Sequence, residues 1–202
     1  MPAPLLQAQA NWGAPANSVL AVDETFDGEQ LPSDFAVNIG QWNVSDGKLV
    51  ASEAEADNHA AAARYKVQTE NAVYQVKFRL GEATKAFHVG FDPAKGELDK
   101  KGHLFSVVIT PKGWRLMKHA DKNRPKEDPN EVLAKSGESF QPGQSYQLRI
   151  TTWEGYVTAM VEGVEPLKGS HPSFAVRKPT VVFRCAGTGL EIDDLKVWKQ
   201  AD

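Results

Sequence analysis

The 202-residue sequence has only one cysteine and no long apolar run. A single cysteine, Cys185, excludes an internal disulfide, and its place in the apolar run 181–185 predicts a buried, inert thiol. No stretch approaches the roughly 18 apolar residues that a membrane-spanning helix needs. The first four residues, MPAP, lack the charged and apolar regions of a secretory signal. Two alternatives follow: a cytosolic protein, or the mature form of a secreted one.

The chain also has little net charge and no basic run. Its 23 Lys and Arg residues nearly balance 26 Asp and Glu residues, for a net charge of −3. This balance gives little electrostatic attraction to nucleic acid or to an anionic membrane, so neither is expected as a partner. No amphipathic helix and no internal repeat is recognisable. A chain of this length and pattern is typical of one all-β domain with a substantial core.

Alternation of apolar and polar residues predicts strands along most of the chain. Residues 73–80 alternate most regularly and place Tyr74 and Phe78 on the core face. Asp46-Gly47 predicts a tight hairpin turn. About a dozen short strands are typical of a β-sandwich. We expect a loosely ordered arm over residues 1–21 and one sandwich domain over residues 22–202. The expected strands are residues 42–44, 48–52, 58–67, 73–80, 86–91, 103–110, 114–118, 131–135, 145–153, 156–161, 180–185 and 190–198.

Residues 84–119 hold three of the five histidines, so we expect any functional site to include part of this stretch. Alternation places His88 outside the core in one strand and Arg184 outside it in another. The first hypothesis is a ligand-binding face on which arginines bind a polar or acidic saccharide and a tryptophan stacks on it. The candidate ligand-binding residues are Lys77, Arg79, His88, His103, Trp114, His119 and Arg184.

Two other interpretations of these residues are open. The first is an ordinary solvated polar face. The second is a metal site formed by the three histidines, although His88, His103 and His119 lack ligand-type partners two or four residues away.

Four segments carry a resemblance to a known superfamily: residues 24–28 (ETFDG), 42–50 (WNVSDGKLV), 74–80 and 190–198 (LEIDDLKVW). They resemble the concanavalin A-like lectin/glucanase jelly rolls, and most of all bacterial secreted domains of the 3-keto-disaccharide hydrolase type. The resemblance spans residues 22–199 and implies a two-sheet antiparallel jelly-roll β-sandwich. It also implies a secreted or periplasmic location and a carbohydrate ligand on a concave sheet face. Because the superfamily includes glycosidases, lyases and non-catalytic binding modules, the fold alone selects no chemistry.

Two functions are therefore open: a non-catalytic carbohydrate-binding domain, or a hydrolase or lyase acting on a 3-keto or acidic sugar. Glycosidases use two nearby carboxylates, whereas the expected face carries mainly Lys, Arg, His and Gln. The glucanase pattern Glu-x-Asp-x-x-Glu is absent from residues 191–196, EIDDLK. A lyase fits a basic face better, because arginine neutralises a uronate carboxylate and histidine acts as a base. Neither function requires a cofactor.

The alternation slips by one residue at Asp193-Asp194, which predicts a β-bulge or an inward carboxylate. The resemblance implies that the first and last strands lie side by side and that a structural calcium sometimes ties them. Its ligands would come from Glu24, Asp27, Asp193 and Asp194, since calcium prefers oxygen ligands. The alternative is that these carboxylates accept N–H bonds from loops. The sequence gives no indication of the oligomeric state.

Overall fold

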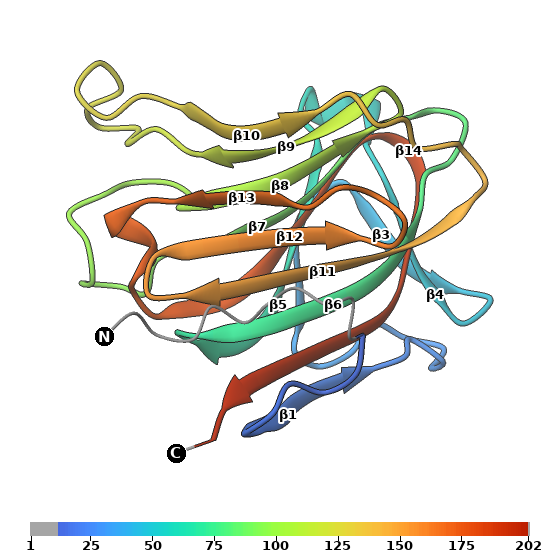
Figure 1. The fold of residues 1–202 in the computed structure, drawn as a ribbon. Helices are drawn as coiled ribbons and strands as arrows, with labels where there is room; N and C mark the ends of the chain where they lie inside the picture. The colour runs from blue at the N-terminus through green and yellow to red at the C-terminus, as the bar shows by residue number, and fades with distance from the viewer. Residues whose placement is uncertain (1–11, 202) are drawn as a thin grey trace.

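A computed structural model of the protein describes residues 12–201, and this part of the chain folds into fourteen strands (Figure 1). All strand pairs are antiparallel. The strands are β1 (Ser18–Glu24), β2 (Phe35–Ile39), β3 (Gln41–Ser45), β4 (Lys48–Ser52), β5 (Ala61–Thr69), β6 (Ala72–Arg79), β7 (Thr84–Phe91), β8 (Phe105–Thr110), β9 (Gly113–Lys118), β10 (Glu131–Ser136), β11 (Ser145–Trp153), β12 (Tyr156–Val161), β13 (Leu167–Ser170) and β14 (Lys178–Gln200).

The strands form two sheets that share one long strand. Sheet A has the order β3-β4-β14-β6-β11-β12-β13, and β1 also pairs with β14 in this sheet (Figure 1). Sheet B has the order β2-β5-β14-β7-β8-β9-β10. Residues 178–187 of β14 pair within sheet B, and residues 188–200 pair within sheet A. The predicted two-sheet jelly-roll sandwich is confirmed.

The core lies between the two sheets and is rich in phenylalanine. Phe78 of β6 packs against Phe87 of β7, with ring centroids 5.4 Å apart, and Phe91 packs against Phe105 at 4.7 Å. These four side chains are at most 1% exposed. Burying each such side chain contributes roughly 1.5–3 kcal/mol. The alternation in β6 and β7 therefore corresponds to the two inner faces of the sandwich.

The observed strands differ from the expected ones mainly at the edges. β2 and β13 fall in segments expected to be loops, and both are edge strands whose stability comes from pairing with β5 and β12. The two expected strands 180–185 and 190–198 are one continuous strand, β14. β1 begins at Ser18, so the ordered domain starts before residue 22. The predicted bulge at Asp193-Asp194 is confirmed by a register shift between β14 and β6. Residues 1–11 of the expected arm lie outside the described residues.

The helices of the described residues are two single turns of 3-10 helix, η1 (Glu55–Asp57) and η2 (Pro172–Phe174). No helix in this part of the chain has the length and apolar character needed to cross a membrane.

Candidate functional site

The outer face of sheet B brings together most of the residues that the sequence singles out. Outward positions alternate with core positions along β5, β14, β7, β8 and β9, and the register aligns them across the sheet. We use the name histidine face for a group of these outward side chains together with nearby side chains at the ends of the strands. It consists of Arg64, His88, Asp92, His103, Ser106, Arg115, His119 and Arg184.

Two outward-pointing valines lie buried beneath the histidine face. Val182 of β14 is 1% exposed and Val108 of β8 is 0% exposed, although neither belongs to the contiguous core between the sheets. Val182 lies opposite Arg64 and Gly90, and Val108 lies opposite His88 and Arg115. The valines therefore form a floor beneath longer polar side chains.

A carboxylate orients one of the histidines. The Nδ1–H of His103 donates to one oxygen of Asp92, and Arg64 Nε donates to the other at 2.9 Å. Burial opposes the ionisation of Asp92, but the hydrogen bonds and charges of His103 and Arg64 outweigh it and hold the pKa of Asp92 below its usual value. The ionised carboxylate fixes His103 with Nδ1 as the donor. When His103 is neutral, its Nε2 is available as a base or a hydrogen-bond acceptor.

A second histidine on this face is paired with a serine. His119 Nε2 and Ser106 Oγ are hydrogen-bonded at 2.8 Å. The hydroxyl lies over Gly90, where an added Cβ would come within 2.6 Å of it, so a larger residue at this position would displace the hydroxyl. The rings of His103 and His119 meet edge to face with centroids 5.5 Å apart. Burial, together with the charge of His103, lowers the pKa of His119 to about 4, so it is neutral at pH 7.

His88 and Arg184 lie directly opposite each other on β7 and β14. Burial, and then the charges of Arg184, His119 and Arg115, lower the pKa of His88 to about 3. Burial, together with repulsion from Arg64, also lowers the pKa of Arg184 from its ordinary value. His88 Nδ1 and Arg184 Nε are both buried and have no hydrogen-bond partner. Buried polar atoms without partners are costly, so these two are the strongest indication of a ligand on this face.

Two loops beside the histidine face are fastened to each other. Lys100 Nζ donates to the backbone carbonyl of His119 at 2.8 Å. The backbone N–H of Lys101 donates to the Asp121 carboxylate at 3.1 Å, and the Lys101 carbonyl accepts from Lys122 N–H at 2.9 Å. Residues 92–104 and 119–130 therefore form a connected rim next to His103 and His119.

The structure separates three of the predicted ligand-binding residues from the others. Lys77 and Arg79 lie on β6 and face outward from sheet A, where Lys77 pairs with Asp194 and Arg79 Nε donates to Glu191 at 2.8 Å. They do not share a surface with His88, contrary to the sequence prediction. Trp114 points into the core and is 2% exposed, so it cannot stack on a ligand as predicted. His88, His103, His119 and Arg184 are brought together.

Four members of the histidine face were missed by the sequence interpretation: Arg64, Asp92, Ser106 and Arg115. Arg115 alternates with the core residues Trp114 and Leu116, so strand parity could have indicated it. Ser106 alternates in the same way with Phe105 and Val107. Asp92 offered no comparable signal, because its role depends on its contact with His103.

The predicted calcium ligands lie near the pairing of the first and last strands, where Glu24 of β1 is opposite Leu195 of β14. Asp193 accepts the N–H of Asp194 at 2.7 Å, and Glu24 accepts the N–H of Phe26 at 2.8 Å. Burial raises the pKa of Asp193. The described residues contain no group of three or more His, Cys, Asp or Glu side chains arranged to hold a metal ion.

We expect EDTA to leave the melting temperature unchanged, because Glu24, Asp193 and Asp194 already have protein partners. Thermal unfolding in EDTA and in added calcium is the measurement. A lower melting temperature in EDTA that calcium restores would contradict this expectation and support the predicted calcium site.

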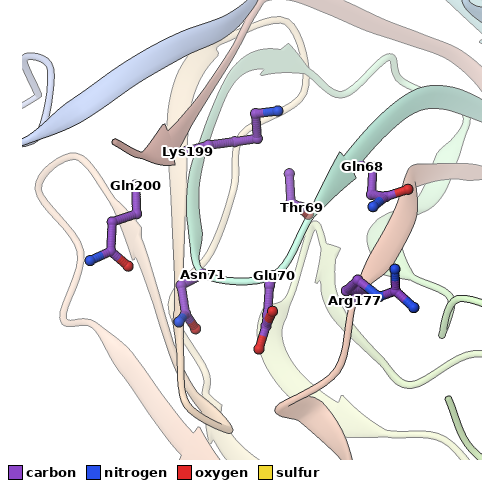
Figure 2. Close-up of a pocket in the computed structure, with 7 residues that line it drawn as sticks. All are labelled: Gln68, Thr69, Glu70, Asn71, Arg177, Lys199 and Gln200. Carbon is purple, nitrogen blue, oxygen red and sulfur yellow. The ribbon is translucent and has the colours of Figure 1, made fainter. Parts of the chain in front are cut away.

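A cavity of about 280 Å³ lies away from the histidine face, between the β5–β6 turn and the end of β14. Figure 2 shows the side chains that line it, which are Gln68, Thr69, Glu70, Asn71, Arg177, Lys199 and Gln200. Most of them are exposed, and Arg177 is engaged by Glu97. This cavity lacks the buried unpartnered groups that mark the histidine face.

No protein-family model and no curated protein matches this chain. Solved structures match its fold. A non-specific endo-β-1,3(4)-glucanase of family GH16 has a TM-score of 0.70 at 10% identity and covers 93% of each chain. A protein of unknown function with a galectin-like fold from Bacillus subtilis has a TM-score of 0.68 at 14% identity, covering 90% of this chain and 96% of the other. The carbohydrate-binding module CBM66 from Bacillus subtilis has a TM-score of 0.55 at 10% identity, covering 83% and 92%. These similarities confirm the predicted concanavalin A-like fold.

Proposed function

We propose that the protein binds a saccharide on the histidine face of sheet B. The observation that carries this proposal is the pair of buried, unpartnered polar atoms, His88 Nδ1 and Arg184 Nε, on the outward face of sheet B. Sugar hydroxyls both donate and accept hydrogen bonds, so one ring can satisfy both a guanidinium and an imidazole. The connected rim beside His103 and His119 limits how much of the site must become ordered on binding.

The fold neighbours support a carbohydrate ligand. They include an endo-glucanase and a carbohydrate-binding module, which share the sandwich but not the sequence. The further likeness to 3-keto-disaccharide hydrolases stays a prediction, as does a secreted or periplasmic location.

A second candidate function is catalysis on an acidic or modified sugar, and the Asp92–His103 pair favours it. A histidine held by an ionised carboxylate is a common arrangement for a general base. Neutral His119, hydrogen-bonded to Ser106, lies in edge contact with it. Glycoside hydrolysis by two carboxylates is not supported, because Asp92 is the one carboxylate of the histidine face, and the outward positions of β5, β7, β8, β9 and residues 178–187 of β14 hold no Asp or Glu in this described part of the chain. A β-elimination lyase fits these residue types better.

We expect His88→Ala to weaken saccharide binding by about tenfold, equivalent to about 1.4 kcal/mol, because it removes a hydrogen-bonding group from the middle of the face. A glycan array followed by calorimetric titration of the hits measures this. His59→Ala, at an exposed histidine outside the histidine face, is the matched control and should bind normally.

Unchanged affinity of a folded His88→Ala protein would contradict the proposed face. Reducing-end and unsaturated-product assays on the same hits decide between binding and catalysis. Turnover that disappears in His103→Gln while binding persists would favour the second candidate function.

A further inference from the structure

The two arginines of sheet B that form no ion pair within residues 12–201 lie in one row across the sheet. Arg184 on β14 is opposite His88 on β7, His88 is opposite Val108 on β8, and Val108 is opposite Arg115 on β9. Adjacent strands lie roughly 4.8 Å apart, so three strand intervals separate the two arginines by about 14 Å. This distance is longer than a single sugar ring. We call these four residues the arginine row.

Both arginines keep hydrogen-bonding capacity that the protein does not use. Arg184 Nε is buried and unpartnered, and Arg115 Nε donates only to the Met117 thioether sulfur at 2.9 Å, which is a weak acceptor. Within residues 12–201 neither guanidinium forms an ion pair, in contrast to the other exposed or half-buried arginines Arg64, Arg79, Arg124 and Arg177.

The arginine row also concentrates positive charge where burial makes it costly. Burial is the main cause that lowers the pKa of His88, and the charges of Arg184 and Arg115, which reach it from both sides, lower it further. Asp92 does not offset them, because its two oxygens are held by His103 and Arg64. Lys135 of β10, opposite Arg115, extends the row with another cation. A ligand that brings negative charge would relieve this repulsion, whereas a neutral ligand would not.

We propose that the ligand is an acidic oligosaccharide or polysaccharide that lies across the strands, with acidic groups bound at Arg184 and at Arg115 and an uncharged part over His88 and Val108. This inference rests on the proposed function and specifies its ligand class. Planar guanidinium groups bind carboxylate and sulfate groups through paired, charge-assisted hydrogen bonds. Val108 lies buried between His88 and Arg115 in the row and adds no charge between the two charged positions.

The test compares calorimetric titrations of an oligogalacturonate, a sulfated glycan oligosaccharide and a neutral cello-oligosaccharide of matched length. We expect an acidic oligosaccharide to bind at least about tenfold more tightly than the neutral one, and to lose affinity as salt is raised. Arg184→Gln and Arg115→Gln should each reduce acidic binding by about tenfold, and should reduce neutral binding by less. Arg79→Gln is the matched control, because this arginine lies on sheet A and is paired with Glu191.

The outcomes separate the inference from the proposed function. Equal affinity for acidic and neutral oligosaccharides overturns the proposal of an acidic ligand but leaves saccharide binding intact. The same conclusion follows if both arginine variants melt normally and still bind the acidic oligosaccharides as tightly as the parent protein. If single-stranded DNA binds as tightly as the acidic oligosaccharides, the proposal of an acidic saccharide ligand is also overturned, since the face would then attract any polyanion. Absence of binding to all three oligosaccharides counts against both proposals.

Discussion

Lowering the pH from about 7 to about 5 is expected to reduce the free energy of unfolding by about 4 kcal/mol through two histidines of the histidine face. In the folded protein the pKa of His88 is lowered to about 3 and that of His119 to about 4, in both cases chiefly by burial. An unfolded histidine titrates near pH 6.5. Between these values the unfolded state binds protons that the folded state does not, so stability falls as the pH falls.

Each histidine contributes about 2 kcal/mol of this loss at about pH 5. Asp92 does not contribute in the same pH range. Its pKa is lowered in the folded state, so its effect is a loss of stability that begins only below the pKa of an unfolded aspartate, near 3.9. Urea unfolding at several pH values measures the slope of the free energy of unfolding against pH. His88→Gln and His119→Gln should each remove about half of it, and the exposed His59→Gln should leave it unchanged. A stability independent of pH in this range would contradict the buried, neutral state of these histidines.

Strand alternation predicted the core well because a two-residue period follows directly from strand geometry. Tyr74 and Phe78 in β6, and Phe87 and Phe91 in β7, all point inward as expected. The same period cannot tell the two outer faces of a sandwich apart. β6 and β7 follow each other in sequence after a short connection typical of a hairpin, yet β6 pairs within sheet A and β7 within sheet B. Arg79 and His88 are therefore both outward and lie on different surfaces.

The candidate site was predictable only in part, because strand parity gives the direction of a side chain but not its partners. His88 and Arg184 were placed outward correctly, and the register then aligns them. The Asp92–His103 pair joins the end of β7 to the residues before β8, and its geometry depends on the loop 92–104. Trp114 was misplaced because a tryptophan in a strand suggested a stacking platform, whereas it alternates with Arg115 and occupies the inward position.

The continuity of β14 was missed because Gly187-Thr188-Gly189 has the composition of a turn. Instead, the two glycines let one strand pass from sheet B to sheet A, with positive φ angles of 82° at Gly187 and 78° at Gly189. The partner strand changes between these two glycines. Gly187 lies opposite Thr84 of β7, whereas Thr188 lies opposite Ser52 of β4. The link between the two sheets thus depends on the backbone conformation of two residues.

Gly187→Ala is expected to destabilise the protein by roughly 4 kcal/mol, near the upper end of single-substitution effects. Alanine at a positive φ costs about 1–2 kcal/mol. In addition, a Cβ at Gly187 would collide with the backbone carbonyl oxygen of Ala83, which accepts the N–H of Thr188 at 3.2 Å. That carbonyl cannot move away without losing this hydrogen bond, so overpacking adds a further cost of about 1–3 kcal/mol.

Gly189→Ala is the matched control, because it has nearly the same φ but its added Cβ would lie 3.7 Å from Gly81 Cα, an ordinary contact. It should cost only the backbone term of about 1–2 kcal/mol. Chemical denaturation of the two variants measures the difference between them, which isolates the close approach of β14 to Ala83. Equal destabilisation by the two substitutions would show that the crossing between the sheets is set by the φ angle alone. A Gly187→Ala protein as stable as the parent would contradict the continuous path of β14.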